Sequence, residues 1–383
     1  MIERARATQG DEAKRDPVRL DEKLHAIAYR RLPHVLAVLC ALIVFPLIWM
    51  GGLVTTHAAG MAVPDWPNTY GYNLLLYPYY DWFFGPWDLF VEHGHRLLGA
   101  LAGFVAILLV VASYWQDQRR WFRRLTVLAL LLIIVQGLLG GARVLLDQRT
   151  LALVHGSVGP LFFALISAIA IMSSRWWHSM GGYFSIETAS LECQRTVSKP
   201  YLPTIFTRLS LTLLIASYLQ LLIGANMRHV LESAEPNWYY TLVLSHVWMA
   251  TLVLILAILI FFVSRNRGFG DCGVRWLAGS LAGLVVAQIC LGVSTWIVKF
   301  GVPALFNMPE QAEQFLIVER TFVQTTIITA HVAVGSLILA MSTCLSVRCL
   351  RVFWPILMLM PWEKARSKNL FTKSTLSHEP QST

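Results

Sequence analysis

Eight long apolar segments restrict what this chain can fold into. A helix needs about 20 predominantly apolar residues to cross a hydrocarbon core of about 30 Å. A soluble domain of this length would carry about a quarter charged residues, whereas this sequence is 56% hydrophobic and only 14% charged. The sequence therefore predicts eight membrane-spanning helices, at residues 34–54, 92–115, 125–146, 151–174, 206–227, 241–263, 275–298 and 322–346.

The distribution of basic residues orients these helices. The two tails and the loops that follow the second, fourth and sixth apolar segments hold 25 of the 31 lysines and arginines. Because lysine and arginine are enriched in cytoplasmic segments, both termini are expected in the cytoplasm. The net charge of +9 mostly reflects this bias, so we expect no nucleic-acid partner.

A four-residue spacing recurs near the outer ends of the odd-numbered segments. Gln136 and Gly140, Gln220 and Gly224, and Gln288 and Gly292 are each four apart, and Leu47 precedes Gly51 in the same way. Residues four apart lie on one helix face. These positions serve helix packing, and they also leave room for a flat ligand.

The repeated unit is a pair of helices, used four times, which predicts an all-α membrane protein of two pseudo-symmetric four-helix bundles. We expect five parts. They are a cytoplasmic tail (1–33), an N-terminal bundle (34–174), a cytoplasmic linker (175–205), a C-terminal bundle (206–346) and a second tail (347–383).

Four histidines occupy the first part of alternate segments: His95, His155, His246 and His331. Alternate helices run in the same direction, so the four imidazoles are expected at similar depth. An ionisable side chain inside a membrane is costly and indicates function. One buried histidine is more often a hydrogen-bonded structural residue. Four at matched depth favour two ligand pairs, His95 with His155 and His246 with His331.

Haem iron is the group that best fits these pairs. No carboxylate or thiolate accompanies them to complete a compact zinc site. The sequence has no CxxC or CxxCH motif, which argues against a zinc ribbon and against covalently attached haem. One histidine from each of two facing helices suits bis-histidine ligation, so all four histidines are predicted to bind haem iron.

The segment from Glu92 to Arg96 is the most specific local cluster. Glu92, His95 and Arg96 share a neighbouring helix surface because they are three and four residues apart. One interpretation is an ion pair at the membrane edge. The other assigns His95 to the metal, Arg96 to a haem propionate and Glu92 to proton transfer. The equivalent position before His246 has no carboxylate in its helix, so chemistry is expected in the N-terminal half.

The outer face carries further candidates. The loop at 55–91 is aromatic and acidic, as expected either for an interfacial aromatic belt or for a lid over a ring-shaped substrate. Arg143 and Arg228 follow the repeated glycines and are candidates for propionates or for lipid headgroups. His229 is expected to be solvated, and His93 should point away from the face of His95.

These motifs together resemble the haem A synthase family. The resemblance rests on Gly51-Gly-Leu-Val-Thr-Thr, Gly60-Met-Ala-Val-Pro-Asp-Trp-Pro67, Glu92 with His95-Arg96, Leu151-Ala-Leu-Val-His155-Gly, His246 and Thr329-Ala-His331. It extends over about residues 40–346, nearly the whole membrane region. Some bacterial members have a cysteine pair in an outer loop. None of the six cysteines here lies in one, so the chain is similar to the cysteine-free subgroup.

The resemblance implies an eight-helix enzyme that oxidises the C8 methyl of haem O to a formyl group, for cytochrome oxidase. It implies that His95 and His155, with Arg96, bind the substrate haem O and that Glu92 is catalytic. It also implies that His246 and His331 ligate a haem b cofactor.

Other readings and partners follow from the same residues. A di-haem b-type electron-transfer protein would need the four histidines but not Glu92, and a transporter with histidine proton relays would hold no haem. The synthase needs haem O, the haem O synthase that supplies it and an electron donor. Oxidase assembly factors and a homo-oligomer are further candidates. A multi-pass protein of the bacterial inner membrane is the simplest location, since the first 33 residues resemble no secretory or organellar signal.

Overall fold

A computed structural model describes residues 30–182, 201–229, 236–265, 273–300 and 321–375. Within these ranges the chain is helical. No β-strand forms there, and a single bridge pair joins Thr69 to Tyr72. Eight of the described helices are long and apolar enough to cross a membrane. The predicted all-α membrane class is therefore confirmed.

The eight long helices are α3 (Arg31–Thr56), α5 (Trp87–Gln116), α6 (Arg120–Leu146), α7 (Arg149–Met172), α10 (Tyr201–Arg228), α11 (Pro236–Ser264), α12 (Val274–Phe300) and α13 (Phe322–Thr375). The shorter described elements are η1 (Ala59–Met61), α4 (Tyr79–Phe83) and α8 (Arg175–Gly182).

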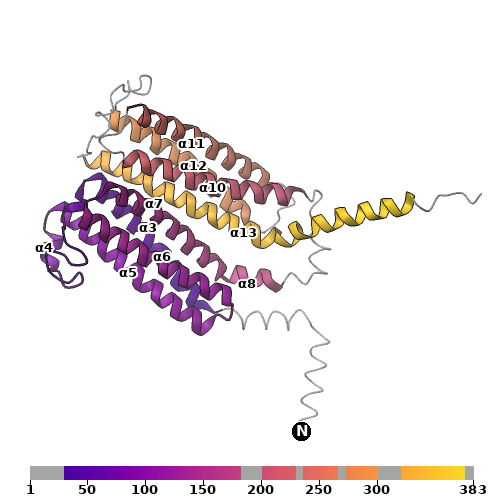
Figure 1. The fold of residues 1–383 in the computed structure, drawn as a ribbon, viewed down its shortest axis with the longest axis horizontal. Helices are drawn as coiled ribbons and strands as arrows, with labels where there is room; N and C mark the ends of the chain where they lie inside the picture. Colours follow the sequence, from indigo (N-terminus) through magenta and orange to yellow (C-terminus); the bar gives the residue numbers. More distant parts are fainter. Residues whose placement is uncertain (1–29, 183–200, 230–235, 266–272, 301–320, 376–383) are drawn as a thin grey trace, which may run out of the picture.

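The helices form two groups that lie side by side (Figure 1). In the first half, α3 packs along α5 and α7, and α6 packs against both α5 and α7. In the second half, α10 and α12 each pack against α11 and α13. The halves meet where α3 and α7 contact α13, with α10 beside α7. We call this meeting place of α3, α7, α10 and α13 the seam.

Each half has its own apolar core. One cluster of buried side chains lies among α3, α5, α6 and α7, including Phe122, Ile166 and Leu109, and the other lies among α10 to α13, including Phe206 and Leu281. Large apolar side chains on the outer faces are exposed instead, as expected where lipid replaces water. Burial thus divides the molecule into two packed halves with an apolar perimeter.

The helices extend beyond the segments that hydropathy marks. The second predicted span begins at 92, but α5 begins at Trp87, directly after Pro86. The last predicted span ends at 346, but α13 continues to Thr375, through sequence expected to be a tail. Hydropathy detects the part of a helix that suits lipid, whereas backbone hydrogen bonding continues into polar sequence.

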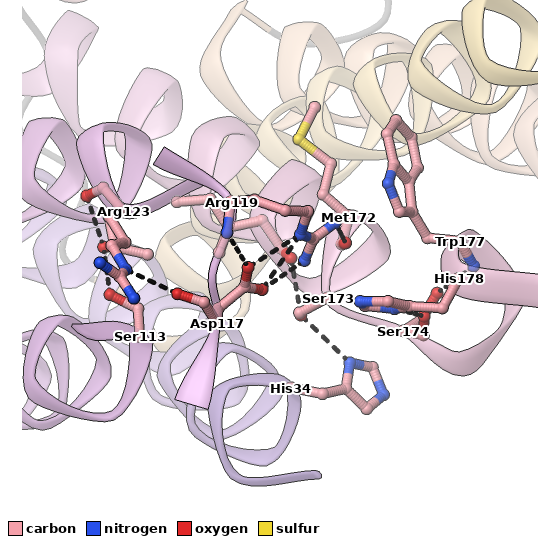
Figure 2. Close-up of polar contacts among 12 residues, drawn as sticks. His34, Ser113, Asp117, Arg119, Arg123, Met172, Ser173, Ser174, Trp177 and His178 are labelled. Carbon is pink, nitrogen blue, oxygen red and sulfur yellow. Dashed lines mark hydrogen bonds and ion pairs between the residues drawn. The ribbon is translucent and has the colours of Figure 1, made fainter. Parts of the chain in front are cut away.

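A polar network joins the helix ends on the side expected to face the cytoplasm (Figure 2). Arg119 binds both carboxylate oxygens of Asp117, at 2.5 to 3.1 Å, and donates to the Met172 carbonyl at 2.9 Å. Arg123 donates to the Asp117 carbonyl at 2.6 Å, and His34 donates to the Ala170 carbonyl at 2.9 Å. These bonds hold the ends of α3, α5, α6 and α7 together, at the opposite end of the helices from the loop that carries α4.

Candidate functional site

The structure brings the four histidines together as the two expected pairs. The ring centroids of His95 and His155 are 6.3 Å apart, and those of His246 and His331 are 6.2 Å apart. In each pair, one ring comes from an outer helix and the other from a seam helix. Two helices of each half therefore face one another through imidazoles at nearly the same separation.

A glycine from the preceding odd-numbered span makes room for each imidazole. A Cβ atom at Gly51 would lie 2.8 Å from Cε1 of His95, and one at Gly140 would lie 3.0 Å from Cε1 of His155. A Cβ at Gly224 or Gly292 would lie 3.1 Å from the next imidazole in the chain. The repeated glycines therefore let each ring lie against a bare helix backbone.

This close approach also fixes the histidine tautomer in the N-terminal pair. Nδ1 of His95 donates to the Leu47 carbonyl, and Nδ1 of His155 donates to the Gln136 carbonyl, each at 3.1 Å. A histidine whose Nδ1–H is engaged by a backbone carbonyl presents Nε2 as a ligand. Both rings of this pair are thus prepared to bind a metal through Nε2.

Two of the three repeated glutamines bind the backbone of the histidine helices. The amide of Gln136 donates to the His155 carbonyl at 2.7 Å, and that of Gln288 donates to the His331 carbonyl at 2.9 Å. Glycine again provides the space, because a Cβ at Gly335 would lie 3.2 Å from the Gln288 amide nitrogen. In the Gln-x3-Gly spacing, the glutamine therefore positions the histidine helix and the glycine makes room for the imidazole.

The geometry of the pairs fits one iron atom between each two rings. Metal–nitrogen bonds to histidine are about 2 Å long. The distance between two ring centroids across one iron is the sum of two such bonds and two nitrogen-to-centroid distances. This sum is close to the centroid separations of both pairs. The described residues contain no cluster of three or more histidine, cysteine, aspartate or glutamate side chains able to hold a metal. Two axial imidazoles suit a haem, whose porphyrin supplies the other ligands.

A buried carboxylate distinguishes the N-terminal pair. Glu92 is only 2% exposed and lies on α5, one turn before His95. Its Oε1 accepts from Arg96 at 2.9 Å, and its Oε2 accepts from the Val63 backbone N–H at 3.2 Å. A carboxylate in such surroundings is a candidate for proton transfer.

Arg96 fastens the outer loop to α5. Besides Glu92, its guanidinium donates to the carbonyls of Val63 and Asp65 at 2.7 Å and of Asn68 at 2.8 Å. These bonds use the fork of donors that was expected to bind a haem propionate. That pairing stays a prediction, and the contacts observed give Arg96 a role in holding the loop over the site.

A second arginine and a tryptophan complete this cap. Arg143 donates to the Gly60 carbonyl at 3.1 Å, so α6 holds the start of the loop. The indole of Trp66 lies directly over Gly141, where any Cβ would overlap it. The segment from Gly60 to Asn68 thus closes over the N-terminal pair, consistent with a lid.

Asp65 organises the far side of the same loop. Its carboxylate accepts from the backbone N–H groups of Tyr70 and Gly71, each at 2.8 Å. Partial burial acts to raise the pKa of Asp65, but backbone hydrogen bonds, chiefly these two, together with the Arg96 charge outweigh it and lower the pKa below its ordinary value. The ionised carboxylate therefore stabilises the turn.

His93, two residues before His95, points away from the pair as expected. Its Nδ1 lies 2.9 Å from the Thr69 hydroxyl, and its ring packs between Tyr77 and Trp82. His93 is therefore part of the packing between α5 and the loop.

Two residues at the end of α10 have contacts that sequence reasoning missed. Arg228 reaches α3 and donates to the Gly52 carbonyl at 2.7 Å and to the Thr56 hydroxyl at 2.5 Å. His229 was expected to be solvated, but burial and then the Arg228 charge lower its pKa to about 4. Its Nε2 atom would lie 3.8 Å from a Cβ at Gly156 of α7. The end of α10 thus crosses into the N-terminal half.

Part of the chain matches the model of a known protein family. The model of the COX15-CtaA family, described as "Cytochrome oxidase assembly protein", matches residues 86–236. This range contains the N-terminal pair, Glu92, Arg96 and the end of α10. His246 and His331 lie beyond it.

Curated relatives show the same likeness. The chain is 24% identical over 278 residues to a protein of Shouchella clausii named "Heme A synthase", which covers 68% of this chain and 85% of the relative. It is 30% identical over 135 residues to a "Heme A synthase" of Listeria monocytogenes, covering 33% of this chain and 40% of the relative. A protein of Listeria innocua with the same name has the same identity and coverage.

Proposed function

Since the chain belongs to the haem A synthase family of cytochrome oxidase assembly proteins, we propose that it oxidises the C8 methyl group of haem O to a formyl group. Each of two hydroxylations inserts one oxygen atom of O2 into a C–H bond, consumes two electrons and two protons, and releases water. The second gives a gem-diol, which loses water to leave the aldehyde of haem A.

The N-terminal pair is assigned to the substrate. His95 and His155 hold the haem O iron between α5 and α7, which fixes the position of the porphyrin edge relative to Glu92. The Oε atoms of Glu92 accept or deliver protons next to the reacting methyl group. The loop held by Arg96 covers the site and excludes bulk water.

The C-terminal pair is assigned to a resident haem b. His246 and His331 would hold it between α11 and α13, where it supplies one-electron redox chemistry. No carboxylate is present in the turns before His246 in α11, so we place no proton chemistry there.

The observation that carries this proposal is a difference between two similar sites. Both have paired imidazoles at nearly the same separation and glycines that make room for them. Among the described residues, the N-terminal pair alone has a buried carboxylate one turn away. A protein that only transfers electrons through two haems has no need of this carboxylate.

Pigment extraction from the purified protein tests the proposal. Haem O or haem A found together with haem B supports the synthase. Haem B alone would favour an electron-transfer protein, and the absence of any haem would exclude both.

A matched pair of variants tests the carboxylate. Glu92→Gln removes the buried charge while keeping its size, and it should leave the haem B spectrum intact and abolish haem A formation. Asp88→Asn is the control, because Asp88 lies one turn earlier on the same helix and is exposed. Retained haem A formation in Glu92→Gln would remove Glu92 from the mechanism.

We propose the following cellular setting. The protein has eight candidate spans and bacterial relatives, which favour the inner membrane of a bacterium. The reaction needs haem O from a haem O synthase and electrons from a donor. Both of these, together with oxidase assembly factors, are the partners we expect.

A further inference from the structure

Two adjacent glycines of α3 face the two halves of the protein. Gly51 lies against the ring of His95 in the N-terminal half. Gly52 lies against α13, where a Cβ would be 2.8 Å from the Thr329 methyl group, and Thr329 is two residues before His331. The outer end of α3 therefore contacts both His95 and the turn of α13 that precedes His331.

Arg228 binds this end of α3 from the C-terminal half. Its Nη2 donates to the Gly52 carbonyl and to the Thr56 hydroxyl. The Thr56 hydroxyl also lies 3.4 Å from that of Thr329, and both threonine side chains are buried. A continuous polar contact thus leads from the guanidinium to the helix turn that carries His331.

Arg228 forms no ion pair with a carboxylate among the described residues, in contrast to Arg96 with Glu92 and Arg119 with Asp117. A cation in such a place is costly unless it serves a purpose. Thr56 and Thr329 connect the guanidinium of Arg228 to the turn that carries His331. Arg228 is among the charges that act on His331, after that of His246. The charge of the neighbouring His229 interacts with that of His155.

Arg143 occupies the corresponding place in the N-terminal half but acts differently. It follows Gly140 by three residues, as Arg228 follows Gly224 by four. It donates to Gly60 in its own half, and its electrostatic interactions include His95 and His155. Arg228 alone of these two arginines reaches across the seam.

We propose that Arg228 is a positioning residue that sets the redox equilibrium of the C-terminal site. Its charge, held on the seam by Gly52 and Thr56, favours the ferrous state of the haem between His246 and His331. The inference rests on the proposed function. A haem held by His246 and His331 would supply one electron to a haem held by His95 and His155, the first passing from ferrous to ferric and the second from ferric to ferrous. No bond forms or breaks in this step.

The test is an anaerobic redox titration of the purified full-length protein, followed by haem b absorbance. Arg228→Gln should lower the ferrous-to-ferric ratio about tenfold at a fixed potential, which is a fall of about 59 mV in midpoint for one electron. Arg228→Lys should retain most of the wild-type value. Arg143→Gln, the matched control, should leave the haem b midpoint unchanged.

The outcomes separate this inference from the proposed function. A wild-type protein that binds no haem refutes the proposed function. Full haem b occupancy with a wild-type midpoint in Arg228→Gln, or an equal fall in Arg143→Gln, overturns the role of Arg228 alone. If Arg228→Gln does not retain haem, Thr56→Val decides. It keeps the charge but loosens its position, and should lower the ratio about threefold, whereas an unchanged midpoint overturns the inference.

Discussion

The imidazole of His95 lies in the space that a side chain at Gly51 would occupy, with Cε1 only 2.8 Å from the position of such a Cβ. The same contact brings Nδ1 of His95 to the Leu47 carbonyl, one turn earlier on α3. The glycine and the hydrogen bond are therefore two parts of one arrangement that aims Nε2 at the partner ring.

Gly51→Ala should weaken binding at the N-terminal site. The added methyl must displace the imidazole, and overpacking of this kind costs about 1–3 kcal/mol. We expect the affinity for added haem O to fall about tenfold or more, measured by absorbance titration of the purified variant. Gly103→Ala is the control, because a Cβ at Gly103 of α5 meets no atom within 4 Å. Equal affinities in the two variants would contradict the arrangement.

Gln288→Leu should weaken the retention of haem b at the C-terminal site without blocking the site. The substitution removes the bond from the amide to the His331 carbonyl, which is worth about 1 kcal/mol. Leucine should fit, since Leu47 occupies the equivalent position in α3. We expect about a fivefold faster loss of haem b to an external haem acceptor, with the protein still folded. An unchanged rate of loss would show that the amide does not position His331.

Gly141→Ala should displace the cap while sparing the haem b site. The methyl group overlaps the indole of Trp66, so the loop from Gly60 to Asn68 has to move. We expect faster limited proteolysis of this loop, strongly reduced haem A formation and an unchanged haem b spectrum. Gly137→Ala, one turn earlier on α6, meets no atom within 4 Å and should resemble the wild type. A proteolysis rate equal to that of the control would place Trp66 elsewhere.

The outer loop should loosen in acid because of Asp65. The pKa of Asp65 is lowered in the folded protein, so its stabilising effect is complete above the unfolded pKa of about 3.9. The effect is lost as the pH falls through the lower, folded value. Protease sensitivity of the loop, measured by an acid-active protease, should therefore rise below about pH 4. Asp65→Asn should be more sensitive already at pH 7 and respond less to acid. A wild-type profile in that variant would contradict the role of the carboxylate.

Hydropathy and helix direction were enough to predict the spans and the two histidine pairs. Each apolar run is long enough to cross the membrane. Alternate helices run in the same direction, so their first turns lie near the same membrane face. The ends of the helices were less predictable, because α5 begins in the loop sequence at Trp87 and α13 continues past residue 346. Nothing in an apolar pattern marks where backbone hydrogen bonds stop.

The partners of the charged residues were the least predictable part of the site. Arg96 and Arg228 could be assigned to the outer parts of their segments, but their contacts depend on the path of a loop and on the course of α10. His229 was expected in solvent because it follows the last apolar turn. In the structure, α10 brings it against Gly156 of the other half. Sequence position gives depth in the membrane, and it does not give which neighbour a helix end approaches.

Gly99 is a suitable labelling position in the copy of the repeat where Leu47 replaces the glutamine. Gly159 and Gly335 each face a glutamine amide four residues after a ligand histidine, whereas α3 has Leu47 and leaves Gly99 with no atom within 4 Å of a Cβ. A cysteine introduced there could carry a spin label or fluorophore one turn from His95, without displacing a neighbour. With the six native cysteines replaced, such a label would report the arrival and departure of substrate in real time.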